Sequence, residues 1–268
     1  MRRRGFSAAL GALALLAAAA PGGPAPATAG SGGAAAMVRP GADLRTRYEV
    51  FADGFRFGEA EVRLATGGGR YLLEARAEAQ GLLGLIIRSR YRGMATGRWR
   101  GAGRPRPERF HARSQRIFKD RTTDIRFGPG ARPVAVEMTP ARDHTRFTDP
   151  AAVPDARIDP LSYLVLLFGH RGPGCPAPAP LYDGRRLTRV ALVPAAPRAG
   201  APAGSLRCIG RYEIVDGPTH SILSGVRVFA LDLAYGPAPE PGAPRPLERI
   251  EVAAGSDHVV FERIGPDR

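Results

Sequence analysis

An alternation of apolar and charged residues, over positions 59–64 and again over 70–79 apart from Leu72, constrains the fold of this chain more than any other feature. Apolar residues fill the even positions of 60–64, and after the turn signal Gly67-Gly68-Gly69 they fill the odd positions of 71–79. A period of two places apolar side chains on one face of a strand and charged ones on the other, as in an antiparallel sheet with one wet face. Just upstream, Asp53-Gly54 is a strong signal for a two-residue hairpin turn.

The phase of this alternation changes at Gly58. Phe55 and Phe57 face one way before it, and the apolar residues that follow lie at even positions, so we expect a β-bulge. Further short strands, separated by Gly and Pro, are expected at 88–100, 109–115, 121–127, 133–138, 186–193, 206–215, 226–235, 247–253 and 258–264. The continuous apolar segment 81–87 fits either a buried strand or a short helical lid.

One segment carries helix signals. Asp159 followed by Pro160 is typical of a helix start, because Asp caps free N–H groups and Pro suits the first helical position. The apolar residues that follow, and Gly169 at the expected end, predict a short buried helix at 160–168. Together these patterns predict an all-β, mainly antiparallel fold. We expect a curved or barrel-like sheet with this one helix, formed by residues 43–268 as a single domain.

The start of the chain has the pattern of a secretory signal peptide. An arginine-rich head precedes an apolar stretch over 5–20, and Ala27-Thr28-Ala29 supplies the small residues of a cleavage site. We therefore expect residues 1–29 to be removed, 30–42 to be a disordered linker, and the protein to be periplasmic. Arg3-Arg4 also resembles a twin-arginine signal, but the general secretory route is favoured. No later apolar segment is long enough to span a bilayer.

The positive charge of the chain is almost entirely arginine. Lys and Arg number 39 against 25 Asp and Glu, a formal net charge of +14, and Lys119 is the single lysine. Abundant Ala, Gly and Pro accompany this bias, which is typical of a GC-rich genome rather than of selection for phosphate contacts. We expect no nucleic-acid partner. An exported protein of this charge meets anionic lipid, lipopolysaccharide or polysaccharide first.

The chain has two cysteines, Cys175 and Cys208. An even number in an exported protein favours a disulfide between them. A redox or metal-binding pair is the alternative, but the two cysteines lack CxxC spacing and no histidines cluster near them.

Several segments resemble a known family. YEVFADGFRFGEAEVRL, RYLLEARAEAQGLLGLI, IDPLSYLVLL and the string C-x6-YDGRR with a later cysteine are similar to domain of unknown function 3108, a family of exported bacterial proteins. The resemblance runs from Tyr48 to Ile214. It implies an exported, β-rich protein with no established activity. Tyr163 departs from the small aliphatic residue expected after DPLS. The chain is also distantly similar to the half-barrels of periplasmic lipoprotein carriers.

The sequence carries no catalytic signature. Its five histidines have no ligand spacing, so we expect neither a metal nor a cofactor. Asp143-His144 with a distant serine could form a triad, but no GxSxG elbow accompanies it. We therefore expect a protein that is not an enzyme.

Two sets of residues are candidates for binding. The aromatic residues Phe55, Phe57, Tyr71, Tyr91 and Trp99 would line an apolar groove if the sheet curls, although core packing is the simpler interpretation. The second set is Asp183, Arg185 and Arg186 around Gly184. These residues form either a solvated hairpin turn or a clamp for an anion at the rim of the groove, since arginine binds such groups bidentately.

We therefore expect non-catalytic binding of an apolar or amphipathic envelope component such as a lipid. The second interpretation is an envelope-assembly adaptor that pairs with a partner protein through strand edges. The third is a hydrolase acting on cell-wall or polysaccharide material.

Overall fold

The computed structural model describes residues 43–80, 89–99, 103–116, 119–141, 146–219 and 225–265. These form a 13-stranded sheet, the α-helix α3 (Pro160–Phe168) and two short 3-10 turns, η1 (Pro129–Ala131) and η2 (Pro150–Ala152). The strands are β1 (Asp43–Ala52), β2 (Phe55–Gly67), β3 (Arg70–Ala79), β4 (Arg90–Arg98), β5 (Arg106–Arg116), β6 (Lys119–Phe127), β7 (Pro133–Thr139), β8 (Ala179–Tyr182), β9 (Leu187–Ala195), β10 (Leu206–Asp216), β11 (Val228–Tyr235), β12 (Leu247–Ala254) and β13 (Asp257–Ile264). The predicted signal peptide, the linker and the apolar segment 81–87 lie outside the described residues.

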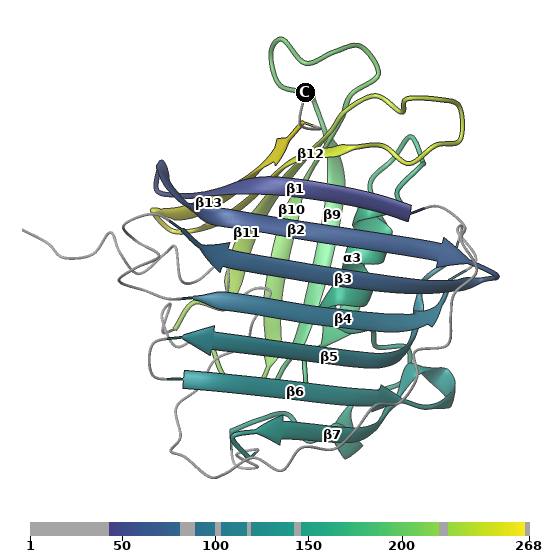
Figure 1. Cartoon of the computed structure of the whole chain (residues 1–268), viewed down its shortest axis with the longest axis vertical. Coiled ribbons are helices and arrows are strands. Elements are labelled where there is room, and N and C mark those ends of the chain that lie inside the picture. The colour runs from purple at the N-terminus through teal and green to yellow at the C-terminus, as the bar shows by residue number, and fades with distance from the viewer. Residues whose placement is uncertain are drawn as a thin grey trace, which may run out of the picture.

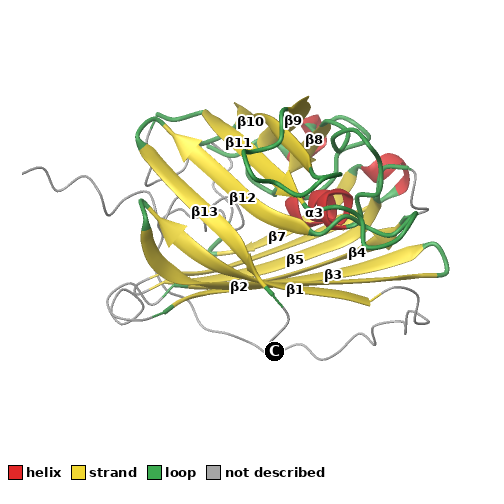
Figure 2. Cartoon of the chain, turned by 90° about the horizontal axis from the view of Figure 1, so that it is seen from above, coloured by secondary structure: helices red, strands yellow, loops and turns green. Residues whose placement is uncertain are grey.

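The sheet consists of two antiparallel meanders, and the first and last strands of the chain pair with each other in the middle of the strand order. Strands β1 to β7 pair in sequence, as do β8 to β13, and β1 pairs with β13. Figure 1 shows β1 to β7 side by side, and Figure 2 shows that the sheet folds over so that β8 to β13 face them, with α3 between the two layers. Strands β7 and β8 are the edges, so the sheet is curved but not closed. This confirms the predicted fold class.

The predicted bulge is present in β2. The β1–β2 register shifts between Val50 and Phe51, which leaves Phe57 as the extra residue and changes the phase of burial as expected. The prediction that Phe55 shares the buried position of Phe57 is wrong. Phe55 is 72% exposed, because it pairs with Ala52 beside the two-residue turn, at the tip of the hairpin.

Helix α3 has the predicted bounds and fills part of the space between the layers. The Asp159 side chain caps it by accepting a hydrogen bond from the Ser162 N–H (2.8 Å). At the other end, Gly169 lies so close to the indole of Trp99 that an added Cβ would be 2.1 Å from the ring. The helix packs on β3, β4, β5 and β8, so it anchors one layer to the edge of the other.

The two edges of the sheet approach each other through side chains. A Cβ on Gly184, in the turn between β8 and β9, would be 3.0 Å from Thr123 of β6 and 3.5 Å from Ile125. Cys175, in the segment between α3 and β8, and Cys208 of β10 form a disulfide with a Cα–Cα distance of 5.8 Å, as the sequence predicted. Among the described residues no helix is long and apolar enough to cross a membrane.

Candidate functional site

A cavity of about 130 Å³ lies between the two layers of the sheet. It is lined by Tyr48, Ala60, Val62, Ala75 and Arg76 from one layer, by Leu181, Val190, Leu192, Tyr212, Leu231, Leu233, Ile250, Val252 and Phe261 from the other, and by Pro160, Tyr163, Leu164, Leu167 and Phe168 from α3. The lining is apolar apart from tyrosine hydroxyls and Arg76. Leu164, Leu231 and Ile250 are only half-buried, so this side of the cavity meets solvent.

Small side chains leave part of the space between the layers and α3 unfilled. Ala60 of β2 and Ala75 of β3 contribute only methyl groups to its wall. The opposite wall comes from the buried face of β9, where Val190 and Leu192 alternate with outward residues. The site is thus formed by strands whose apolar side chains alternate with outward-facing ones, together with a helix that is almost entirely apolar.

The aromatic residues predicted to line a groove have other positions. Phe57, Tyr71 and Tyr91 are buried in the core and are not part of the cavity wall. The aromatic residues that do line it are Tyr48, Tyr163, Phe168, Tyr212 and Phe261. The alternation identifies the buried face of each strand, but not the part of that face where the layers separate.

Tyr71 takes part in a buried polar network at the start of α3. Its hydroxyl lies 2.5 Å from the Ser162 Oγ, and Ser162 in turn donates to the carboxylate of Asp159. Complete burial raises the pKa of Asp159 to about 6, against the lowering effect of the hydrogen bonds from Ser162. The network fixes the helix against β3, which is a structural role.

The Asp183 turn is buried, so the prediction that its arginines lie at an exposed rim is wrong. Arg185 and Arg186 are each 1% exposed, because the turn packs on β6. Asp183 Oδ1 accepts hydrogen bonds from the backbone N–H groups of both arginines (2.9 Å each), and Arg186 Nε lies 3.1 Å from Asp183 Oδ2. The Arg185 guanidinium stacks over the ring of Phe147 at 4.2 Å.

The electrostatic environment of this turn is strongly positive. Burial, followed by the charges of Arg121 and Arg186, lowers the pKa of Arg185 to about 9. Burial lowers the pKa of Arg121 to about 10, with further lowering by neighbouring arginine charges. We call Arg121, Arg185 and Arg186 the arginine cluster. Its three guanidinium groups outnumber the single neighbouring carboxylate among the described residues, Asp183, so the cluster can stabilise a further negatively charged group.

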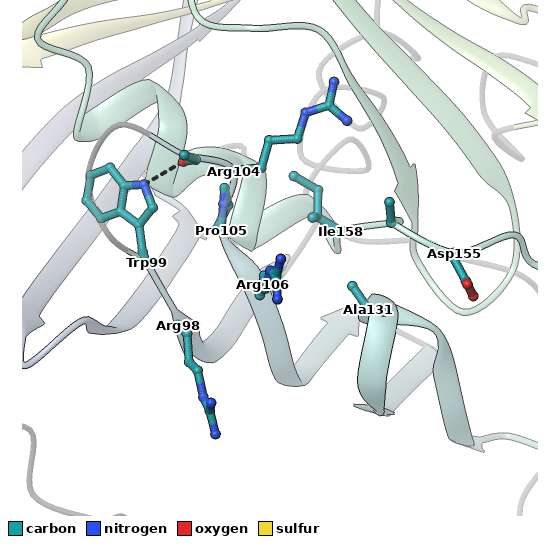
Figure 3. A pocket seen from close by; sticks show the side chains of 11 residues that line it. Arg98, Trp99, Arg104, Pro105, Arg106, Ala131, Asp155 and Ile158 are labelled. Carbon is teal, nitrogen blue, oxygen red and sulfur yellow. Dashed lines mark hydrogen bonds between the residues drawn. The ribbon is translucent and has the colours of Figure 1, made fainter.

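A second pocket, of about 800 Å³, lies near the start of β5 (Figure 3). Trp99 lines it, and its indole donates a hydrogen bond to the Gly103 carbonyl (3.0 Å). Arg98, Arg104 and Arg106 also contribute. Its size lies in the range of ligand pockets, although its arginines are exposed and therefore well solvated.

The described histidines have ordinary structural partners. His111 lies 3.0 Å from Asp124, and His170 lies 2.6 Å from the Gly174 carbonyl. In the described part of the chain no group of three or more His, Cys, Asp or Glu residues could hold a metal ion. Asp143 and His144, the candidates for a triad, lie outside the described residues.

Comparison with known proteins identifies a family but no activity. No curated protein matches this sequence. A solved structure described as a β-barrel-like protein of a domain of unknown function, DUF1849, from Brucella abortus superposes with a TM-score of 0.46 and 10% identity, over 85% of this chain and 98% of that one. The family described as protein of unknown function (DUF3108) matches residues 47–196, more than half of the 268 residues, so this chain belongs to that family.

Proposed function

We propose that this protein is an exported, periplasmic, non-catalytic binding protein that takes up the apolar part of an amphipathic envelope molecule between its two layers. The observation that carries this proposal is the cavity of about 130 Å³ with its apolar lining. An apolar cavity of roughly this size in a protein core stays dry and accepts a small apolar molecule. The ligand we infer is the end of an acyl or isoprenoid chain.

The exposure of the lining supports entry from one side. Leu164, Leu231 and Ile250 form a half-buried group on α3, β11 and β12, and each is part of the cavity wall. A chain that enters here replaces water at apolar side chains and contacts Val190 and Leu192 more deeply. The affinity then comes mainly from the apolar area that is removed from water.

The test is to purify the protein from a periplasm and analyse it by native mass spectrometry and lipid extraction. In parallel, the purified protein is titrated with N-phenyl-1-naphthylamine, an uncharged apolar fluorophore. We expect a co-purified amphiphile and saturable fluorescence enhancement. A clean ligand-free species that also fails to take up the fluorophore contradicts the proposal.

A pair of variants separates cavity binding from surface binding. Ala75→Leu places a larger side chain in the cavity wall and should weaken fluorophore binding at least tenfold. Ala230→Leu adds the same side chain at an exposed position of β11 and should leave binding unchanged. Equal binding by both variants and the parent contradicts binding in the cavity. Thermal unfolding of each variant verifies that it is folded.

A second candidate function is that of an adaptor that pairs with a partner strand at β7. This strand ends the sheet, and its Val134 is 65% exposed. The other edge, β8, is partly covered, because the backbone N–H of Tyr182 donates to the carbonyl of Ile158 (2.9 Å). A photo-crosslinking residue at position 134 should capture a protein in cells if the adaptor function holds, whereas a carrier should yield lipid adducts near the cavity.

A further inference from the structure

We propose that Arg185 is the centre of a buried binding site for an anionic group, a carboxylate or a phosphate. This rests on the proposed function and specifies its ligand as an amphiphile with a negatively charged head. Three features of the structure support this site: the unsatisfied donors of Arg185, the positive charge around it, and the row of buried residues that runs from its neighbour Arg186 to the apolar cavity.

The guanidinium of Arg185 is buried, and two of its donors have no acceptor among the residues that the structure describes. The residue is 1% exposed, and within that part of the chain neither Nε nor Nη1, both fully buried, has a hydrogen-bond partner. The contact made by the guanidinium is its stacking over Phe147. A guanidinium presents two forks, Nε with Nη2 and Nη1 with Nη2, and each fork of Arg185 therefore contains an unsatisfied donor. Carboxylate and phosphate oxygens match these forks.

The backbone around Arg185 holds it in place without using its side chain. Asp183 Oδ1 accepts from its N–H (2.9 Å), and the N–H of Thr148 donates to its carbonyl (2.9 Å). The guanidinium is thus preorganised. Fixing a charged donor in advance reduces the entropy that a ligand must lose on binding.

The charge near Arg185 favours an anion. Arg121, from β6, and Arg186 both act on it as like charges, and Asp183 is the carboxylate that opposes them. Asp183 already accepts from two backbone N–H groups and lies beside Arg186. Like charges held together away from water raise one another's energy, and a bound anion lowers it.

The inner face of β9 connects the arginine cluster to the cavity. Arg186, Thr188, Val190 and Leu192 are all buried at alternate positions, and the last two line the cavity. Val190 lies four positions after Arg186, which is about 13 Å along an extended strand. Tyr212, opposite Val190 on β10, also lines the cavity, and the Arg186 charge acts on its hydroxyl. We infer that an extended molecule seated against Val190 could place its charged end near Arg186 and the adjacent Arg185.

The test compares three ligands of equal chain length: an alkyl carboxylate, an alkyl phosphate and the uncharged alcohol. Displacement of N-phenyl-1-naphthylamine measures their affinities for the full mature protein. We expect the two anions to bind at least tenfold more tightly than the alcohol. Equal affinities in the parent protein overturn the anion site, and this result needs no variant.

Two substitutions localise the effect. Arg185→Gln should remove the preference for anions and leave the affinity for the alcohol unchanged, whereas Arg90→Gln, at an exposed arginine paired with Glu78, should preserve the preference. A preference that survives Arg185→Gln overturns the assignment to Arg185. Arg185→Lys keeps the charge but loses the paired N–H donors of the guanidinium, so it should show an intermediate preference for anions. It replaces Arg185→Gln in this test if the Gln variant is unfolded.

Inorganic phosphate separates this inference from the proposed function. If no amphiphile binds but phosphate raises the unfolding temperature of the parent protein and not of Arg185→Gln, the anion site stands and the carrier function fails. If the alcohol and the anions bind equally and phosphate has no effect, the carrier function stands and the anion site fails.

Discussion

Replacement of Asp159 by Asn should change the pH dependence of stability in a defined direction. The carboxyl group is completely buried, and burial moves its pKa from 3.8 to about 6 in the folded protein. Between these values the folded state holds a proton that the unfolded chain has released. The free energy of unfolding therefore falls as pH rises through this interval, and above it the loss is complete and no longer changes with pH.

The magnitude follows from the same pKa values. A change from 3.8 to about 6 corresponds to about 3 kcal/mol, of which about 2 kcal/mol falls between about pH 4.5 and about pH 7. Asn does not ionise, and its amide oxygen can still accept from the Ser162 N–H while its amide N–H donates to the Ser162 Oγ. The stability of the Asn variant relative to the parent should therefore rise by about 2 kcal/mol over this pH range.

Urea unfolding, followed by the fluorescence of the single tryptophan, Trp99, measures this difference at a series of pH values. Asp149→Asn is the matched control, because Asp149 caps η2 in the same way but is exposed. If the Asp159→Asn and parent curves stay parallel from about pH 4.5 to about pH 7, the carboxyl is already ionised in the folded protein and the reasoning is refuted.

Three further changes test other parts of the structure by urea or thermal unfolding. Reduction of the Cys175–Cys208 bond, which spans a sequence separation of 33, should lower the free energy of unfolding by about 3–4 kcal/mol, and an unchanged urea midpoint contradicts this. Ala75→Leu should be neutral or stabilise by about 1 kcal/mol because it fills the cavity, whereas Ala77→Leu, buried outside the cavity wall, should cost about 1–3 kcal/mol; equal effects argue against the cavity. Gly169→Ala should cost about 1–3 kcal/mol through its collision with the indole, while Gly174→Ala, with open space around it, should be neutral.

Local signals made most of the fold predictable. The period-two pattern of 71–79, the bulge beside Gly58 and the Asp159-Pro160 helix start all depend on near neighbours in sequence, and each is present. Strand β8 escapes prediction, because its four residues, APLY, are too short to show a period and include a proline. It forms because β9 offers a ladder partner and Ile158 covers its other side.

The site could be predicted only in part, because it depends on contacts between distant segments. The string Asp183-Gly184-Arg185-Arg186 indicates a turn correctly, but the burial of its arginines depends on Thr123 and Ile125 of β6, which the local sequence cannot reveal. The cavity wall likewise combines residues of both layers with α3. No pattern within one strand indicates where two layers move apart.

The pairing of β1 with β13 has a consequence for how the chain must be assembled. Every other ladder joins strands that follow one another along the chain, so these hairpins can form locally with little loss of loop entropy. The β1–β13 ladder cannot form until the last strand is available. A product truncated before Asp257 would leave the length of β1 as an unpaired edge in the middle of the molecule, open to strands of other chains, so we expect such fragments to aggregate.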